Sequence, residues 1–216
     1  MTAKNLEDSA LAVSKSLGIE LVEIPRWNCC GVVYSLASDD LMRHLGAIRN
    51  MVRAQTLGSE LGVNKLVTLC AMCYSTMKIV SKNLSGDREK MRKIDFFMDE
   101  EPAYKGGVEV VHLLQTLRDD VGFKAIAKAV QKPLKNLRVA SYYGCMLLRP
   151  EGVELDDPEN PSVMEDLVSA LGGQPVDFPY KTECCGSYHT VAAKRVVGER
   201  ATKIAASGTN LSLIHI

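Results

Sequence analysis

Two short cysteine motifs carry the clearest chemical signal in this sequence. Cys29-Cys30-Gly31 and Cys184-Cys185-Gly186 each place two adjacent thiols before a glycine. A disulfide between neighbouring cysteines closes a strained ring, so a structural bridge explains neither pair well. Paired thiolates are instead typical ligands of soft metal centres, namely iron–sulfur clusters, zinc or copper(I). Glycine lets the backbone approach such a centre closely, so the motifs predict a metal site.

The segments before the two motifs are also alike, which indicates an internal duplication. In both copies a Leu-Gly pair is followed by a short apolar stretch and a proline: Leu17-Gly18 with Val22-Glu23-Ile24-Pro25, and Leu171-Gly172 with Val176-Asp177-Phe178-Pro179. Apolar spacing predicts an amphipathic helix before each Leu-Gly pair, over residues 5–17 and from Val163 onward. Ser162 and Glu165 have the spacing of a capping box for the second helix.

The remaining cysteines follow two stretches that we expect to be strands. Lys65-Leu66-Val67-Thr68-Leu69 leads into Cys70-Ala71-Met72-Cys73, and Leu137–Tyr143 leads into Gly144-Cys145. Ligands of open α/β sheets bind at the carboxyl ends of strands, where these cysteines would lie. A Cys-x-x-Cys pair alone does not identify the chemistry, because thioredoxin-like redox pairs and zinc sites share it.

The rest of the chain predicts further helices and one boundary. We expect a strand over residues 19–24 and helices starting at Ser38, over 74–100, through Val110–Leu117 and over about 190–206. Lys132-Pro133 is the expected boundary between the two halves. The single tryptophan, Trp27, is interpreted as a side chain that closes over buried apolar surface, with shielding of a cofactor from water as the alternative.

Composition excludes several classes of function. The 216 residues include 26 Lys and Arg and 26 Asp and Glu, so the formal net charge is zero, and nothing favours nucleic acid or an acidic membrane surface. No apolar run is long enough to span a bilayer, and the N-terminus lacks the apolar core of a signal peptide. We therefore expect a cytoplasmic protein without a transmembrane segment. In a reducing compartment, seven clustered cysteines are more often metal-binding or redox-active than disulfide-bonded.

The spacing of the cysteines joins the two copies into one pattern. The stretch between Cys30 and Cys70 in the first copy is nearly as long as the stretch between Cys145 and Cys184 in the second. Each copy lacks the part that the other contains. Superposed, they give a single cysteine, then Cys-Cys-Gly and then Cys-x-x-Cys, joined by two spacers of nearly equal length.

This composite resembles the cysteine-rich CCG domain, and its duplication resembles the family of the heterodisulfide reductase B subunit. The resemblance runs from about Lys15 to Ala206. The strings that carry it are Trp27-Asn28-Cys29-Cys30-Gly31, Leu69-Cys70-Ala71-Met72-Cys73-Tyr74, Tyr142-Tyr143-Gly144-Cys145, Leu147-Leu148-Arg149-Pro150, Asp156-Asp157-Pro158-Glu159-Asn160-Pro161, and the segment Phe178–His189.

The resemblance implies an α/β fold with two similar CCG-type domains, each a small, mainly parallel sheet flanked by helices. Their expected ranges are 1–133 and 134–210. It further implies that five cysteines per domain hold a noncubane [4Fe-4S] cluster, and that two clusters split a disulfide using electrons that arrive one at a time. In methanogens that disulfide joins coenzyme M and coenzyme B. The implied partners are the iron–sulfur (C) and flavin-bearing (A) subunits of a heterodisulfide reductase-like, multi-subunit complex.

The resemblance also assigns ligands. The residues that match four ligands of the first cluster are Cys29, Cys30, Cys70 and Cys73, and those that match three of the second are Cys145, Cys184 and Cys185. The same spacing puts the missing ligands before Met1 and beyond Ile216, so we expect a fragment. Residues 211–216 do not continue the motif; they back-translate to CTG TCT CTT ATA CAC ATC, which reads like a transposon sequencing adapter. We interpret them as an assembly artefact.

Three residues near the cysteines are candidates for other roles. His189, four residues past Cys185, could donate a proton to a departing thiolate, or could orient its loop by hydrogen bonding. Arg149 and Lys181 could hold an anionic group of the substrate, or could form ordinary ion pairs.

Three alternatives to a disulfide reductase stay open. CCG domains also occur in electron-transfer subunits of lactate, glycolate, glycerol-3-phosphate and succinate oxidoreductases. A zinc-stabilised interaction module is a second alternative, although zinc prefers four ligands in a closed tetrahedron and the separated vicinal pairs fit that poorly. Free cysteines in an ordinary core are the third, and two matching Cys-Cys-Gly units argue against it.

Overall fold

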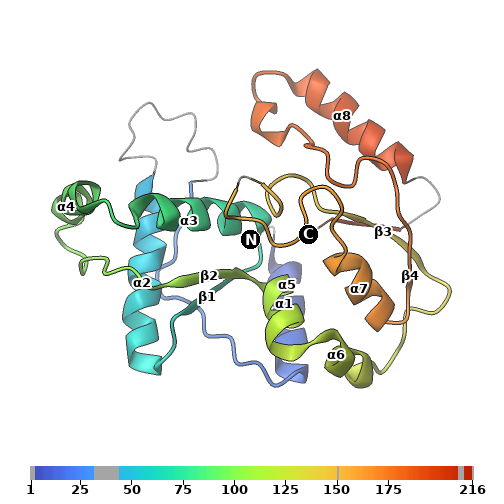
Figure 1. The fold of residues 1–216 in the computed structure, drawn as a ribbon, viewed down its shortest axis with the longest axis horizontal. Coiled ribbons are helices and arrows are strands. Elements are labelled where there is room, and N and C mark those ends of the chain that lie inside the picture. Colours follow the sequence, from blue (N-terminus) through green and yellow to red (C-terminus); the bar gives the residue numbers. More distant parts are fainter. Residues whose placement is uncertain (1–2, 32–43, 150, 209–211, 216) are drawn as a thin grey trace. The chain divides into compact units, whose positions relative to one another are not determined.

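The chain forms two compact units, each of which mixes helices with a small parallel sheet (Figure 1). The computed structural model describes residues 3–31, 44–149 and 151–208, together with the backbone of Ser212–His215. Unit 1 comprises Met1–Leu11 and Glu20–Leu113, and unit 2 comprises Ala12–Ile19 and Leu114–Ile216. The α/β class with two similar domains is thereby confirmed. The units meet along the chain at residues 11–12, 19–20 and 113–114. The domain boundary expected at Lys132-Pro133 stays a prediction.

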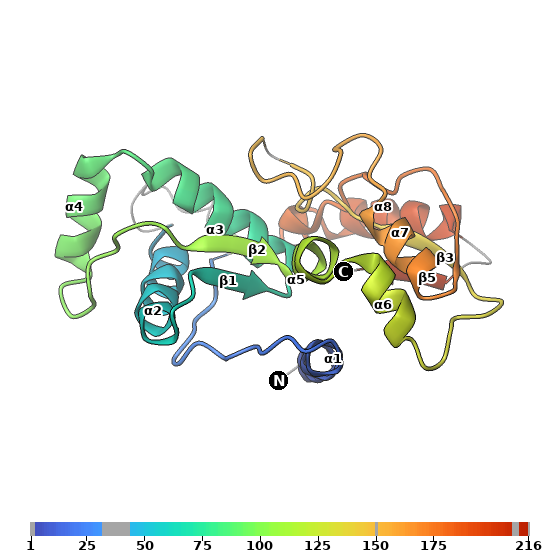
Figure 2. The same ribbon diagram turned by 60° about the horizontal axis from the view of Figure 1, so that its bottom comes forward.

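Unit 1 is built on a pair of parallel strands with helices packed against it (Figure 2). Its elements are the first residues of α1 (Lys4–Ser16), then α2 (Leu45–Leu61), β1 (Lys65–Thr68), α3 (Ala71–Leu84), α4 (Arg88–Phe97) and β2 (Glu109–His112). Leu66 of β1 lies opposite Val110 of β2, and both side chains are buried. The helix start expected at Ser38 lies outside the described residues.

Two helix predictions in unit 1 need correction. Residues 109–112 form β2 and not a helix, because the adjacent valines Val110 and Val111 are both buried beside β1, where β-branched side chains pack well. The helix expected over 74–100 is divided into α3 and α4. Asp87 begins α4, since its carboxylate accepts a hydrogen bond from the backbone N–H of Lys90 at 3.0 Å.

Unit 2 contains a three-stranded parallel sheet in the order β4-β3-β5. Its elements are α5 (Leu113–Thr116), a π-helical turn (Leu117–Val121), α6 (Phe123–Ala129), β3 (Arg138–Tyr142), α7 (Val163–Ala170), β4 (Gln174–Pro175), a 3-10 turn (Ser187–His189), α8 (Lys194–Ser207) and β5 (Ser212–His215). Helix α7 packs against β3 and β4, and α6 packs against α7. Val139, Leu147 and Leu148 are fully buried in its core.

The capping box expected at the start of α7 is wrong in its details. Ser162 makes no side-chain cap bond. Asp156 takes that place, because its Oδ2 accepts the backbone N–H groups of Ser162 and Val163, each at 2.7 Å. The Glu165 carboxylate instead accepts a hydrogen bond from the hydroxyl of Tyr143.

The duplication is visible in the backbone. The two Leu-Gly pairs have glycines with φ of +74° and +80°, Gly18 and Gly172. The residues after the two prolines, Arg26 and Tyr180, both have positive φ, at 56° and 75°, a conformation that non-glycine residues seldom adopt. Residues 19–24, where a strand was expected, have no strand pairing in the described part of the chain, whereas their counterpart in unit 2 includes β4.

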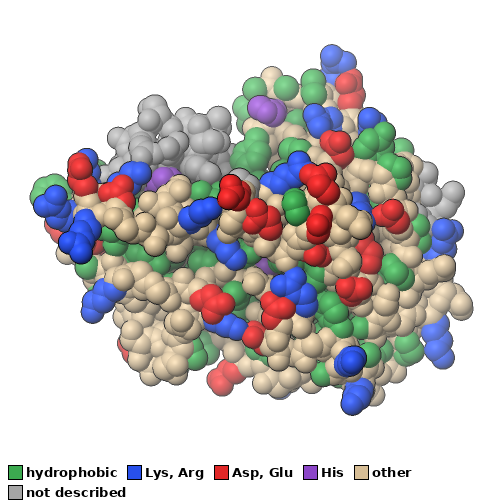
Figure 3. Space-filling view, in the orientation of Figure 1, with side chains coloured by type: hydrophobic (Ala, Val, Ile, Leu, Met, Phe, Trp, Pro, Cys, Tyr) green, Lys and Arg blue, Asp and Glu red, His purple; other side chains and the backbone are tan. Residues whose placement is uncertain are grey.

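The surface carries charges of both signs. Acidic and basic side chains are interspersed over the face shown in Figure 3, as the zero formal net charge suggests. Among the helices of the described residues, none has both the length and the apolar character needed to cross a membrane.

Candidate metal centre

In unit 1, strand β1 and helix α3 bring three thiols together. Cys70 lies at the junction of the two elements and Cys73 in the first turn of α3. The Cys73 thiol is hydrogen-bonded to both Cys30 and Cys70. This contact lowers the pKa of Cys30 and raises that of Cys73, because a single proton between two sulfurs favours one thiolate and one thiol. The amino end of a helix also favours negative charge on such sulfurs.

The adjacent cysteines of the first pair have different surroundings. Cys30 is buried and Cys29 is exposed. Gly46, near the start of α2, lies so close that a Cβ there would stand 2.8 Å from the carbonyl oxygen of Cys29. Gly31, which completes the motif, has a φ of +78°. The backbone of Cys29 therefore passes close to α2, and the chain turns at Gly31 in a conformation that favours glycine.

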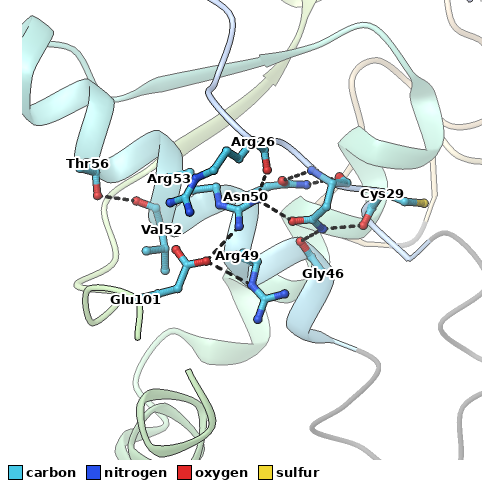
Figure 4. A network of polar contacts seen from close by, with 10 residues as sticks. Arg26, Cys29, Gly46, Arg49, Asn50, Val52, Arg53, Thr56 and Glu101 are labelled. Atoms are coloured by element: carbon cyan, nitrogen blue, oxygen red, sulfur yellow. Dashed lines mark hydrogen bonds and ion pairs between the residues drawn. The ribbon is translucent and has the colours of Figure 1, made fainter. Parts of the chain in front are cut away.

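A polar network on α2 holds the backbone that leads to this pair (Figure 4). Asn50 accepts the backbone N–H of Asn28 at 3.0 Å and donates to its carbonyl oxygen at 2.7 Å. The side chain of Asn28 donates to the carbonyl oxygens of Cys29 at 2.9 Å and Gly46 at 3.0 Å. In Figure 4 the Cys29 side chain extends away from these contacts. The network thus fixes the peptide backbone and leaves the sulfur available.

Two arginines connect the network to Glu101. Arg53 donates to the carbonyl oxygen of Arg26 and to the side chain of Asn28, the latter at 3.2 Å. Glu101 pairs with Arg53 at 2.9 Å and with Arg49 at 3.3 Å. The side chains of Arg53 and Glu101 are only 13% and 14% exposed, so solvent screens this pair less than an ordinary surface ion pair.

In unit 2, β3 brings Gly144-Cys145 against the second Cys-Cys-Gly segment. The backbone N–H groups of Tyr143 and Gly144 donate to the carbonyl oxygen of Lys181 at 2.9 and 3.2 Å. Burial raises the pKa of Cys145 to about 11, and a hydrogen bond with Cys184 adds to the effect. Cys145 and Cys184 are therefore in contact, although they are distant in the sequence.

The second pair is held by α8. Arg200 donates to the carbonyl oxygen of Cys184 at 3.1 Å and pairs with Glu183 at 3.3 Å. One turn further along the helix, Ile204 packs in a buried cluster that Cys185 also contacts. Gly186 has a φ of +77°, which matches Gly31, and its N–H donates to the sulfur of Cys184 at 3.3 Å. In each unit an arginine from a later helix contacts the cysteine segment: Arg200 donates to Cys184 itself, whereas Arg53 donates to Arg26 and Asn28, which precede the first pair.

The other candidate residues are placed as follows. Arg149 pairs with Glu159 at 2.7 Å, and Lys181 pairs with Asp177 at 3.0 Å, so each cation has a carboxylate partner. His189 lies at the end of the 3-10 turn, in an exposed position. Trp27 is 52% exposed and donates to Glu23 at 2.7 Å, so the expectation that it covers buried apolar surface is wrong.

Sequence reasoning missed the residues that position the cysteines. Asn50 is a buried amide on the otherwise apolar face of α2, and Arg53 follows one turn later. A polar residue within an apolar helix face was the signal that could have identified them. Tyr142 also went unassigned, and Glu165 was assigned only to a capping box. Tyr142 could have been singled out as an aromatic residue with a hydroxyl at the end of a buried strand, where it needs a polar partner.

The donor set fits a soft metal centre in its chemistry. All seven cysteines are free, and each unit brings three thiols close together beside a glycine with positive φ. Across residues 3–31, 44–149 and 151–208, however, no three His, Cys, Asp or Glu side chains are arranged to hold one ion. Binding of a metal centre would therefore require the cysteine sulfurs of a unit to move closer together, as expected where metal binding and final folding are coupled.

Known proteins are similar to most of this chain. A protein of Wolinella succinogenes named 8-methylmenaquinol:fumarate reductase membrane anchor subunit is 34% identical over 83% of this chain and 61% of its own length. A ferredoxin/F(420)H(2)-dependent CoB-CoM heterodisulfide reductase B subunit of Methanosarcina acetivorans is 29% identical over 84% and 60%. A protein of Archaeoglobus profundus, described as similar to the B subunit of heterodisulfide reductase, is 29% identical over 84% and 61%.

The chain thus spans about three fifths of the length of these relatives. The family of the CCG cysteine-rich domain matches residues 1–78 and 139–209, which together exceed half of the chain and contain all seven cysteines. With two matched segments, one in each copy of the duplication, the chain belongs to the CCG cysteine-rich domain family.

Proposed function

We propose that this chain is the cysteine-rich subunit of an oxidoreductase complex, and that its two groups of thiols hold iron–sulfur clusters of the noncubane [4Fe-4S] type. The observation that carries the proposal is the repeated arrangement in which a strand end, a vicinal cysteine pair and a glycine with positive φ bring three thiols together. Thiolates of this kind are the ligands of iron–sulfur clusters.

Reduction of a disulfide is the reaction that we favour, because relatives named after the heterodisulfide reductase B subunit match most of the chain. The reaction consumes two electrons and two protons, breaks one S–S bond and releases two thiols. A bound iron–sulfur centre would supply the electrons singly, from partners equivalent to the iron–sulfur and flavin-bearing subunits of such a complex. His189, four residues from Cys185, is our candidate for delivering a proton to the released sulfur.

An anionic substrate would need positive charge near the cysteines. Arg149 follows Cys145 by four residues, and Lys181 precedes Cys184 by three. Both cations also contact the same short loop, since Arg149 reaches Glu159 and Lys181 reaches the carbonyl oxygen of Pro161 at 3.3 Å. We propose that a sulfonate or phosphate group of the substrate exchanges with these partners.

Electron transfer without disulfide chemistry is the second candidate. The relative that is 34% identical is named as a subunit of an 8-methylmenaquinol:fumarate reductase, and fumarate reduction is the reverse of succinate oxidation. In that case the same cysteines would relay electrons between a quinol and a partner, and no thiol would be released.

An assay of the anaerobically purified full-length subunit separates the two candidates. We expect a reduced viologen dye to be oxidised when the heterodisulfide of coenzyme M and coenzyme B is added, with two thiols released per two electrons. The double substitution Cys184→Ala with Cys185→Ala should abolish the release. Absence of thiol release, together with reduction of the chain by a menaquinol analogue, would overturn disulfide reduction in favour of electron transfer.

A further inference from the structure

The hydroxyl of Tyr142 lies among the cysteines of unit 2, although no role has been assigned to it. Tyr142 is the last residue of β3 and is only 3% exposed. Its ring belongs to the buried cluster with Phe178 and Ile204, and Cys185 packs against that cluster. Its hydroxyl donates to the carbonyl oxygen of Glu183 at 2.7 Å, the residue directly before the cysteine pair.

The ring can reach this position because Gly144 has no side chain. A Cβ on Gly144 would stand 3.3 Å from the Tyr142 hydroxyl oxygen and 3.5 Å from two carbons of its ring. Gly144 also has a φ of +63°, which turns the chain so that Cys145 follows immediately. The phenol therefore lies directly beside the segment that carries Cys145.

The electrostatics of the phenol agree with this placement. Burial is the main cause of its raised pKa, and a hydrogen bond with Cys185 and the nearby sulfurs of Cys145 and Cys184 raise the pKa further. A tyrosine hydroxyl ordinarily titrates at about pH 10, so it carries its proton at neutral pH without any shift from its surroundings. A buried phenol beside three sulfurs is a permanent hydrogen-bond donor.

We infer that Tyr142 donates a hydrogen bond to the sulfur of Cys185 when that sulfur is a metal-bound thiolate, and so sets the reduction potential of the second centre. The inference rests on the proposed function. A Cys185 thiol can donate to the phenol oxygen while the phenol donates to Glu183. A thiolate has no proton, and a charged acceptor competes well with a neutral carbonyl group, so the phenol proton turns to sulfur.

The direction of the effect follows from charge. Reduction adds negative charge to the cluster and its sulfurs, and a hydrogen-bond donor stabilises the reduced state more than the oxidised one. Hydrogen bonds to sulfur are one of the features that determine cluster potentials. Tyr142 is thus a positioning residue for the electronics of the site, with no need to touch substrate.

The neighbouring tyrosine provides a matched control. Tyr143 is also buried, at 2% exposure, and directly follows β3. Its hydroxyl donates to Glu165 and accepts the backbone N–H of Met164 at 2.8 Å, and neither of these partners is a sulfur. Removal of either hydroxyl therefore deletes one buried hydrogen-bonding group. Of the two, only the Tyr142 hydroxyl is hydrogen-bonded to the residue next to the cysteine pair, Glu183.

The test is the midpoint potential of the unit 2 centre in the full-length subunit, measured by EPR-monitored titration in a Cys29→Ala, Cys30→Ala background. Tyr142→Phe should lower the potential and alter the EPR spectrum, whereas Tyr143→Phe should leave both unchanged. Replacing Tyr142 with 3-fluorotyrosine, which is a stronger donor and keeps the ring, should raise the potential even if Tyr142→Phe folds poorly.

The outcomes distinguish this inference from the proposed function. A loaded centre whose potential is the same in Tyr142→Phe and wild type would overturn the inference alone. Equal shifts in Tyr142→Phe and Tyr143→Phe would also overturn it, because the effect would then be general loosening of β3. A protein that takes up no iron or sulfide would overturn the proposed function and this inference with it.

Discussion

At the scale of single residues, the backbone that leads to the first cysteine pair is held by the side-chain amide of Asn50. Asn50 satisfies both backbone groups of Asn28, the residue before Cys29. Because Asn50 is 6% exposed and the two hydrogen bonds are partly buried, its loss leaves partly buried backbone groups without these partners. The geometry of the pair is thus determined by a helix that contributes no ligand.

The first prediction concerns this amide. Asn50→Ala should lower the free energy of unfolding by roughly 1–3 kcal/mol and reduce the iron retained by unit 1. Asn64→Ala is the control, since the exposed Asn64 side chain donates only a long hydrogen bond to the carbonyl oxygen of Gly107, at 3.4 Å. Urea unfolding and iron analysis measure both effects, and equal behaviour of the two variants would contradict the positioning role of Asn50.

The second residue-scale prediction concerns His112, which ends β2 and is 1% exposed. Burial lowers its pKa from 6.5 to about 4. As the pH falls, His112 therefore takes up its proton in the unfolded chain before it does so in the folded chain. The contribution of neutral His112 to the free energy of unfolding is complete above pH 6.5 and is lost as the pH falls toward 4. The loss amounts to roughly 3 kcal/mol over that range.

Urea unfolding of unit 1 at pH 7 and pH 4.5 checks this dependence. We expect His112→Gln to be less stable than wild type at pH 7 but to lose less stability on acidification. If wild type and His112→Gln lost the same free energy of unfolding between pH 7 and pH 4.5, His112 would not be the titrating group.

At the scale of elements, the glycines of the two Cys-Cys-Gly motifs are conformational requirements. Gly186 has a φ of +77°, and a Cβ there would lie 3.6 Å from Arg200, so space is available and only backbone strain opposes a side chain. Gly186→Ala should therefore cost about 1–2 kcal/mol. Gly198→Ala, within the exposed part of α8, should instead stabilise by about 1 kcal/mol. Thermal unfolding measures both, and the same sign for both variants would contradict the account.

The start of α7 offers a second element-scale prediction. Asp156 caps two N–H groups, while Ser162, which the sequence pattern favours, caps none. Asp156→Ala should cost about 1–2 kcal/mol, and Ser162→Ala should cost much less. Helix content and thermal unfolding measure the difference. A larger loss of stability in Ser162→Ala than in Asp156→Ala would contradict the role of Asp156 and favour the capping box.

At the scale of the whole molecule, the sequence predicts the α/β class with two similar domains well, because that organisation depends on local patterns, whereas the assignment of the cysteines as ligands stays a prediction. The strands that end at Thr68 and Tyr142 are short apolar runs before cysteines, and they form as expected. The strand over residues 109–112 was not predicted, because it forms by pairing with β1, and the local sequence carries no sign of that pairing.

The contacts that position the site were also beyond sequence reasoning. Glu101 reaches Arg53 across 48 positions of the chain, and Tyr142 reaches Glu183 across 41. Trp27 has the type of a core residue, but its exposure is decided by tertiary packing. Candidate ligands can be proposed from residue type and spacing, whereas the residues that position them can be recognised only in three dimensions.

The most direct test of the central claim is the iron and acid-labile sulfide content of the anaerobically purified full-length subunit. The account predicts both elements in the wild type, a partial loss in Cys30→Ala, a partial loss in Cys185→Ala and loss of nearly all in the double variant. Zinc without sulfide, or iron content indifferent to both substitutions, would contradict it.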